Sequence, residues 1–180
     1  MKVIIVLLLL GLSFGAAAQE TIVWSDIDCG QSKLVVPAGL RCRETNEVGT
    51  RGRATSTGGG VTKRWAAFGT QQQVKLYYYV HEVLSMRSSV QVGQFAEVLR
   101  GTSPEAKGGS HMSEPTARGG VDLVTFTGAH GEDCLGIRRL GPSAGKGVAW
   151  VLYATRCAPA GRKASNAEID AFIAAADFRP

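Results

Sequence analysis

Four cysteines constrain the fold of this chain more than any other feature of its sequence: Cys29, Cys42, Cys134 and Cys157. An even number of cysteines is typical of a disulfide framework in an oxidising compartment. Three pairings are open, and the sequential one, Cys29–Cys42 with Cys134–Cys157, closes the shortest loops. A zinc site is the competing use, but the spacing lacks the C-x-x-C pair that such sites usually show. The sequence therefore predicts two disulfides.

The first eighteen residues indicate where those disulfides form. Lys2 gives a positive start, an apolar run follows over 3–14, and small residues precede a cleavage site after Ala18. This is the layout of a secretory signal peptide. An uncleaved anchor is the alternative, but the apolar stretch is shorter than the roughly 20 residues that cross a bilayer. We expect a signal peptide over 1–18, no membrane span after its removal, and a single domain over 19–180, periplasmic or secreted, in a bacterial protein.

Most apolar segments of the mature chain resemble strands, because they are rich in β-branched and aromatic residues. Shorter strands are expected at 21–24 and 33–37, and surface loops over 46–60 and 101–120. If the predicted strands at 134–140 and 148–155 form a hairpin, Cys134 and Cys157 lie near its open end. The long strands are predicted at 61–68, 74–84, 121–127, 134–140 and 148–155.

Helices are fewer. Ser165, with Glu168 three residues later, predicts a capping box at the start of a C-terminal helix. Phe172 and Ile173 recur at helical spacing and mark its buried face. A shorter helix is expected over 95–100. The predicted fold is α+β: a mainly antiparallel β-sheet with the C-terminal helix packed on one face, stabilised by disulfides.

Basic residues concentrate between positions 41 and 64, and the neighbouring Trp65 offers a plane for stacking. Guanidinium groups suit phosphate, carboxylate and sulfate. No nucleic-acid-binding module accompanies the cluster, so we expect no nucleic-acid partner. The alternative is a solvated loop rich in arginine. The predicted anion-binding residues are Arg41, Arg43, Arg51, Arg53 and Arg64.

Histidines supply a second candidate site, for a metal or another ligand. His130, Glu132 and Asp133 place a base and two carboxylates at one turn between predicted strands, although such turns are ordinarily polar. His81 lies in a tyrosine-rich strand, where it could line a ligand groove with Tyr77 and Tyr79.

No catalytic motif or cofactor-binding motif is present, so no catalytic residue, metal or cofactor is assigned. Without Lys2 the formal net charge falls from +5 to +4, which favours weak association with anionic partners. The leading hypothesis is an exported binding or structural protein that contacts an envelope protein or an anionic glycan or lipid headgroup. The alternatives are a small metal-dependent or hydrolytic enzyme using His130, Glu132 and Asp133, and an inhibitor module that presents the 101–120 loop.

Overall fold

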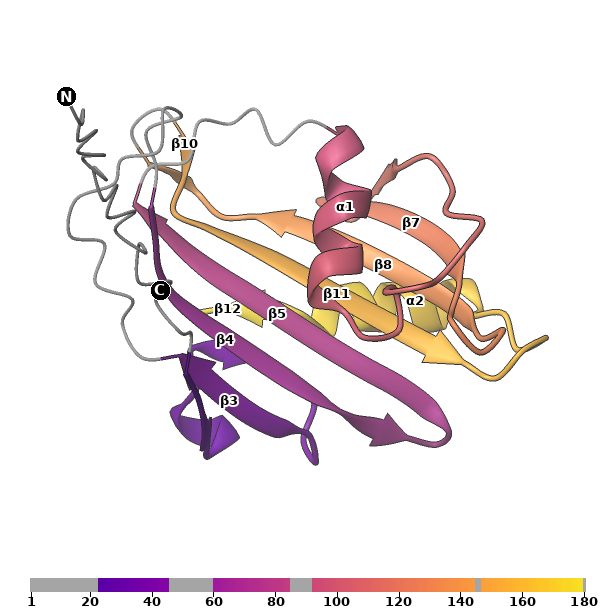
Figure 1. Cartoon of the computed structure of the whole chain (residues 1–180), viewed down its shortest axis with the longest axis horizontal. Helices are drawn as coiled ribbons and strands as arrows, with labels where there is room; N and C mark the ends of the chain where they lie inside the picture. Colours follow the sequence, from indigo (N-terminus) through magenta and orange to yellow (C-terminus); the bar gives the residue numbers. More distant parts are fainter. Residues whose placement is uncertain (1–22, 46–59, 85–91, 145–146, 180) are drawn as a thin grey trace, which may run out of the picture.

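The computed structural model describes residues 23–45, 60–84, 92–144 and 147–179, so the predicted signal peptide, Arg51 and Arg53 lie outside it. Its central feature is a sheet of eight strands in which all neighbours run antiparallel (Figure 1). In spatial order the strands are β1 (Trp24–Ile27), β3 (Arg41–Thr45), β4 (Gly60–Gln71), β5 (Val74–Leu84), β11 (Trp150–Ala158), β8 (Asp133–Leu140), β7 (Val121–Thr127) and β6 (Thr116–Arg118).

Two small sheets and a short 3-10 helix accompany the large sheet. β2 (Leu34–Val35) pairs with β12 (Asp177–Phe178), and β9 (Ser143–Ala144) pairs with β10 (Gly147–Val148). A 3-10 helix, η1 (Cys29–Gln31), precedes β2.

The five long predicted strands correspond to β4, β5, β7, β8 and β11, which confirms a mainly antiparallel sheet. β3 is not predicted, and it places part of the arginine-rich segment inside the sheet. The loop predicted over 101–120 is wrong in part, because β6 occupies Thr116–Arg118. Gly119 and Gly120, both with positive φ, form a tight turn that pairs β6 with β7.

A strained turn joins β4 to β5. Gln71 pairs with Val74, so the loop contains only Gln72 and Gln73, whose φ angles are 48° and 66°. Positive φ at both positions is the signature of a type I′ turn, whose twist matches that of the flanking strands. Glycine or asparagine is usual there, because other side chains crowd the backbone at positive φ. The hairpin therefore tolerates local strain to hold its register.

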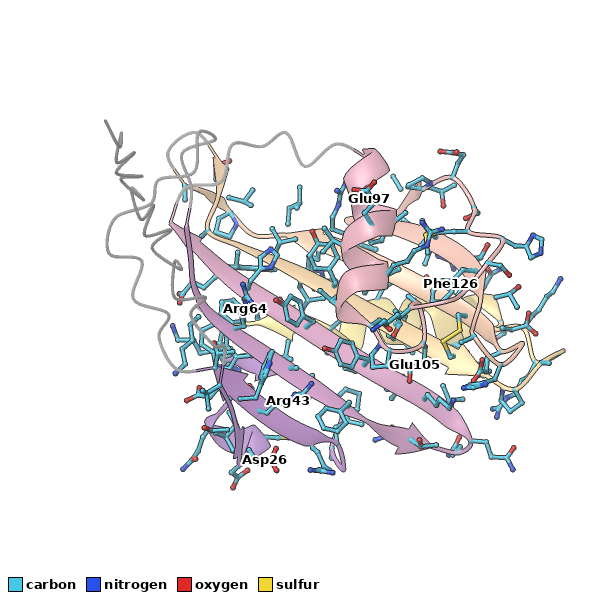
Figure 2. The ribbon with its side chains drawn as sticks, viewed as in Figure 1. Asp26, Arg43, Arg64, Glu97, Glu105 and Phe126 are labelled. Atoms are coloured by element: carbon cyan, nitrogen blue, oxygen red, sulfur yellow. A yellow bond between two sulfur atoms is a disulfide. The ribbon has the colours of Figure 1, made fainter. Side chains whose placement is uncertain are left out.

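Side chains alternate across β5, so the buried residues form two clusters, and Figure 1 shows α1 in front of the sheet and α2 behind it. On the first face, Tyr77 and Tyr79 share a buried cluster with Phe95 and Leu99 of α1 (Val92–Thr102). Phe126 of β7 belongs to the same cluster and lies beside α1 in Figure 2.

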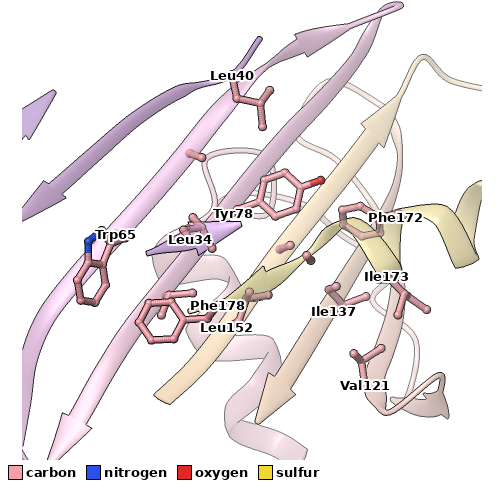
Figure 3. Packing of buried hydrophobic residues seen from close by; sticks show 14 of the residues in the cluster. Leu34, Leu40, Trp65, Tyr78, Val121, Ile137, Leu152, Phe172, Ile173 and Phe178 are labelled. Atoms are coloured by element: carbon pink, nitrogen blue, oxygen red, sulfur yellow. The ribbon is translucent and has the colours of Figure 1, made fainter. Parts of the chain in front are cut away.

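The second face carries the larger cluster (Figure 3). Tyr78, between the two tyrosines above, contacts Phe172 of α2 (Asn166–Ala175), with ring centroids 6.0 Å apart. Phe178 of β12 lies between Trp65 and Trp150, at centroid distances of 5.2 Å and 5.4 Å. Buried apolar surface on both faces makes the sheet the middle layer of three.

The capping box predicted for α2 is confirmed. Ser165 N donates to Glu168 Oε2 at 2.9 Å, and Glu168 N donates to Ser165 Oγ at 3.3 Å. Arg156 of β11 also donates to Glu168, at 2.6 Å, which connects the start of the helix to the sheet. Hydrogen bonds and charge thus fix where α2 begins.

The disulfides follow the sequential pairing. Cys29–Cys42 connects η1 to β3, and Cys134–Cys157 joins residues directly opposite one another on β8 and β11. Such bonds fit a protein that folds outside the cytoplasm. Within the described residues, none of the helices has the length and apolar character needed to cross a membrane.

Relief of strain at the β4–β5 turn should stabilise the protein. Gln73→Gly should raise the free energy of unfolding by about 1 kcal/mol, because glycine adopts positive φ without a steric penalty. Denaturant unfolding monitored by circular dichroism measures the change. Thr70→Gly in the neighbouring extended strand is the control and should destabilise by about 0.5–1 kcal/mol. Equal losses in both variants would show that the turn is not strained.

Candidate functional site

Aromatic and arginine side chains gather on the α1 side of the sheet, over the strands to one side of α1 (Figure 2). They come from β1, β3, β4 and β5, which are neighbours in the sheet in that order. We call this surface the arginine–aromatic face; it comprises Trp24, Arg43, Arg64, Phe68, Tyr77, Tyr79 and His81.

Arg43 is held between two rings. Its guanidinium carbon lies 4.6 Å from the centroid of Trp24 and 5.0 Å from that of Phe68, within cation–π range of both. The Tyr77 hydroxyl is also close: burial raises its pKa to about 12, and Arg43 opposes part of that rise. The Tyr77 hydroxyl therefore stays neutral at neutral pH and does not compensate the charge of Arg43.

Six other described arginines are neutralised by carboxylates. Each forms an ion pair within 4.0 Å with an aspartate or glutamate of the chain. They are Arg41, Arg118, Arg138, Arg139, Arg156 and Arg162.

Arg43 and Arg64 differ from these six. Both are partly buried, and neither has a carboxylate partner among the described residues. The Nε atom of each is buried without an acceptor in that part of the chain. An uncompensated buried donor costs about 1–3 kcal/mol, and more when it is charged. Both guanidinium groups therefore keep unused hydrogen-bond donors within the described part of the chain.

Of the four described arginines without an ion pair, Arg100 and Arg179 are exposed, whereas Arg43 and Arg64 are partly buried and are close neighbours. Arg43 lies opposite Ala66, and Arg64 is two residues from Ala66 on the same strand. Diagonal neighbours of this kind are about 7–8 Å apart on one face of an antiparallel pair. One ligand could therefore contact both groups.

His81 extends the face beside Arg64, its cross-strand partner. The ring is 8% exposed and lies 5.7 Å, centroid to centroid, from both Tyr79 and Tyr153. Its Nε2 atom has no hydrogen-bond partner in the described part of the chain. Burial, helped by the charge of Arg64, lowers the pKa of His81 to about 4, so the ring is neutral at neutral pH.

The remaining predicted anion-binding residues are less well placed. Arg41 is mostly exposed and pairs with Asp26 at 3.3 Å. Arg51 and Arg53 lie outside the described residues. Among the described residues, Arg43 and Arg64 are therefore the predicted anion-binding residues that remain candidates.

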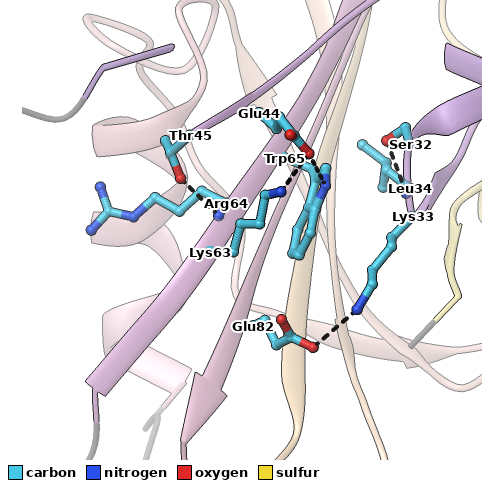
Figure 4. Close-up of polar contacts among 9 residues, drawn as sticks. All are labelled: Ser32, Lys33, Leu34, Glu44, Thr45, Lys63, Arg64, Trp65 and Glu82. Atoms are coloured by element: carbon cyan, nitrogen blue, oxygen red, sulfur yellow. Dashed lines mark hydrogen bonds and ion pairs between the residues drawn. The ribbon is translucent and has the colours of Figure 1, made fainter. Parts of the chain in front are cut away.

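Trp65 does not belong to the arginine–aromatic face. It is buried on the α2 side, where its Nε1 donates to Glu44 at 3.1 Å and Lys63 pairs with the same carboxylate at 2.9 Å (Figure 4). Adjacent residues of a strand point to opposite faces, so Trp65 faces away from Arg64. The rings beside the arginines are instead Trp24 and Phe68, neither of which sequence reasoning selected.

The turn that carries His130, Glu132 and Asp133 is engaged in structural contacts. Lys75 donates to Glu132 Oε1 at 2.7 Å, and the backbone N of His130 donates to Oε2 at 2.9 Å. The hydrogen bond from Lys75 is the main reason that the pKa of Glu132 falls to about 2. Across the described ranges, no group of three His, Cys, Asp or Glu side chains is arranged to hold a metal ion.

A pocket of about 380 Å³ opens beside Arg43. Phe68 and Tyr77 contribute rings, Lys75 a second cation, and Pro104 and Glu105 a wall from the segment that follows α1. A larger pocket, of about 690 Å³, lies along the Cys29–Cys42 disulfide, where Asp26 and Arg41 pair with each other. The smaller pocket is the one that adjoins Arg43, which is partly buried and forms no ion pair among the described residues.

Comparison of the chain with protein-family models, with curated proteins and with solved structures finds no significant match. The candidate site is therefore defined by the geometry of its own residues: two unpaired arginines, the rings around them and the pocket beside Arg43.

His81 should make stability depend on pH. An unfolded histidine titrates near pH 6.5, whereas folded His81 stays neutral until about pH 4. The unfolded chain therefore binds the extra proton first, and up to about 3 kcal/mol of stability, complete above pH 6.5, is lost as the pH falls to about 4. Denaturant unfolding at stepwise pH should show this loss, with a flatter profile for His81→Gln. The exposed His111→Gln is the control and should follow the wild type; equal profiles for all three proteins would contradict the assignment.

Proposed function

We propose that this protein is an exported binding protein that holds an anionic group on the arginine–aromatic face. The observation that carries the proposal is that Arg43 and Arg64, partly buried and close together, lack carboxylate partners among the described residues. The ligand would be an anionic component of the bacterial envelope, in the periplasm or outside the cell. The two disulfides and the predicted signal peptide support that compartment.

The environment of Arg43 favours binding over mere solvation. Stacking between Trp24 and Phe68 restricts the guanidinium plane, so less conformational entropy is lost when an anion binds. The edges of the plane carry the N–H donors, which match carboxylate, phosphate and sulfate oxygens. Stacking occupies the faces and leaves the edges as the binding surface.

The enzyme hypothesis lacks comparable support. A general acid or base at the 128–132 turn would use the Glu132 carboxylate, but Lys75 and the His130 backbone engage both of its oxygens. No observation favours the inhibitor hypothesis over simple binding.

Loss of either unpaired arginine should weaken binding to a polyanion. For Arg43→Gln and Arg64→Gln we expect about a 5–10-fold lower affinity for heparin, since each variant removes charge-assisted hydrogen bonds. Arg41→Gln is the matched control, because it removes the same charge from a mostly exposed residue already paired with Asp26. Isothermal titration calorimetry at two salt concentrations measures the effect.

The comparison among the three variants decides the result. A smaller effect of Arg41→Gln than of the other two supports a site at Arg43 and Arg64. An equal, small and fully salt-suppressed effect of all three would indicate diffuse charge attraction and contradict the proposal. Thermal unfolding of each variant shows that the fold is retained.

A further inference from the structure

The pocket beside Arg43 is not uniformly basic. Arg43 contributes a positive charge that is unpaired among the described residues and Lys75 is already paired with Glu132, but the carboxylate of Glu105 lines the same 380 Å³ space. Figure 2 shows Glu105 on the same side of the sheet as Arg43. A site for a bare anion would exclude a carboxylate, because like charges close together repel.

Glu105 is anchored. Its Oε2 accepts a hydrogen bond from Ser103 Oγ at 3.3 Å, and Ser103 Oγ lies 2.9 Å from Thr155 Oγ1 on β11. Glu105 has no ion-pair partner within 4.0 Å among the described residues. Ser103 and Thr155 therefore connect this carboxylate to the sheet and hold it in the pocket wall. Its second oxygen can accept a hydrogen bond from a ligand.

The pocket thus offers one group for each part of a hydroxylated anion. Arg43 can bind a carboxylate or sulfate, and Glu105 can accept a hydroxyl proton in a hydrogen bond. Pro104, together with the part of the Phe68 ring not covered by Arg43 and Arg41, can pack against an apolar C–H face. A volume of about 380 Å³ falls within the range of small-molecule sites.

We infer that this pocket binds an acidic sugar unit, such as a uronate within an anionic glycan. The inference rests on the proposed function and names the ligand class for the part of that site around Arg43, since Arg64 does not line the pocket. Sugars combine an anionic group, adjacent hydroxyls and an apolar ring face, and the pocket matches all three. A phospholipid bilayer fits less well, because Arg43 is partly buried between two rings and does not project from the surface as Arg41 does.

The test compares two probes by isothermal titration calorimetry. Trigalacturonate carries carboxylates and hydroxyls, whereas polyphosphate carries charge without hydroxyls. Glu105→Ala should weaken trigalacturonate binding about 5–10-fold through the lost hydrogen bond. The same change should strengthen polyphosphate binding, because it removes a repulsive charge. These opposite signs separate a sugar site from a simple anion site.

Matched variants make the result specific. Glu97→Ala removes the same charge from an exposed position on α1 outside the pocket and should change neither affinity by more than about twofold. Glu105→Gln keeps the shape and one acceptor oxygen, so it should show smaller effects in the same directions even if the alanine variant folds poorly. Arg43→Gln should weaken both probes.

Two results would overturn the inference and leave the proposed function standing. One is stronger binding of both probes by Glu105→Ala, and the other is wild-type binding of polyphosphate but not of trigalacturonate. If the wild type binds neither probe and also fails to bind heparin, the proposed function fails with the inference. Binding to phosphatidylglycerol vesicles without binding to trigalacturonate would assign the face to lipid headgroups and likewise reject the sugar.

Discussion

The alternation of side chains along β5 organises both faces of the molecule. Tyr78 points toward α2 and Tyr77 and Tyr79 point toward α1, so three consecutive tyrosines contribute to two separate cores. β5 lies between β4 and β11, and its pleat determines which of their residues share a cluster with each helix. Because the spacing of side chains is fixed by the backbone, the composition of the α2-side core and that of the arginine–aromatic face are set together.

The two faces handle charge in different ways. Near α2, Arg156 pairs with Glu168 at 2.6 Å, and on the same face Lys63 pairs with Glu44 at 2.9 Å. Beside α1, Arg138 pairs with Asp122, but no described carboxylate neutralises Arg43 or Arg64. Uncompensated charge in one region of a well-paired protein is typical of sites shaped by a ligand more than by folding. This imbalance is the observation on which the proposed anion-binding function rests.

Much of the fold could be predicted from local sequence, because local patterns determine it. The β-branched and aromatic runs predicted the long strands, and Ser165 with Glu168 predicted the start of α2. β3 escaped prediction because its five residues are mostly polar and become a strand only through pairing with β1 and β4. The two glycines before β7 resembled a loop and instead form a hairpin turn.

The candidate site was only partly predictable. Arg43 and His81 were selected separately, one from a charge cluster and the other from a tyrosine-rich strand. Whether these residues share one face depends on the register between strands, which the sequence alone does not show. Arg64 and His81, for example, are 17 positions apart along the chain yet lie opposite one another. Trp24 and Phe68 gave no signal, since single aromatic residues near strand ends are common in any sheet protein.

The two-residue turn at Gln72 and Gln73 determines which face of the sheet each β5 side chain occupies. If the turn kept its two-residue geometry, one residue inserted beside it would shift β5 by one position against β4 and exchange its two faces. Tyr78 would then replace Tyr77 and Tyr79 beside the arginines, and His81 would enter the opposite core. A change of two residues would preserve the faces and only displace the partners along the strand. As long as the turn keeps two residues, length variation beside it should therefore be tolerated in even steps and rejected in odd ones.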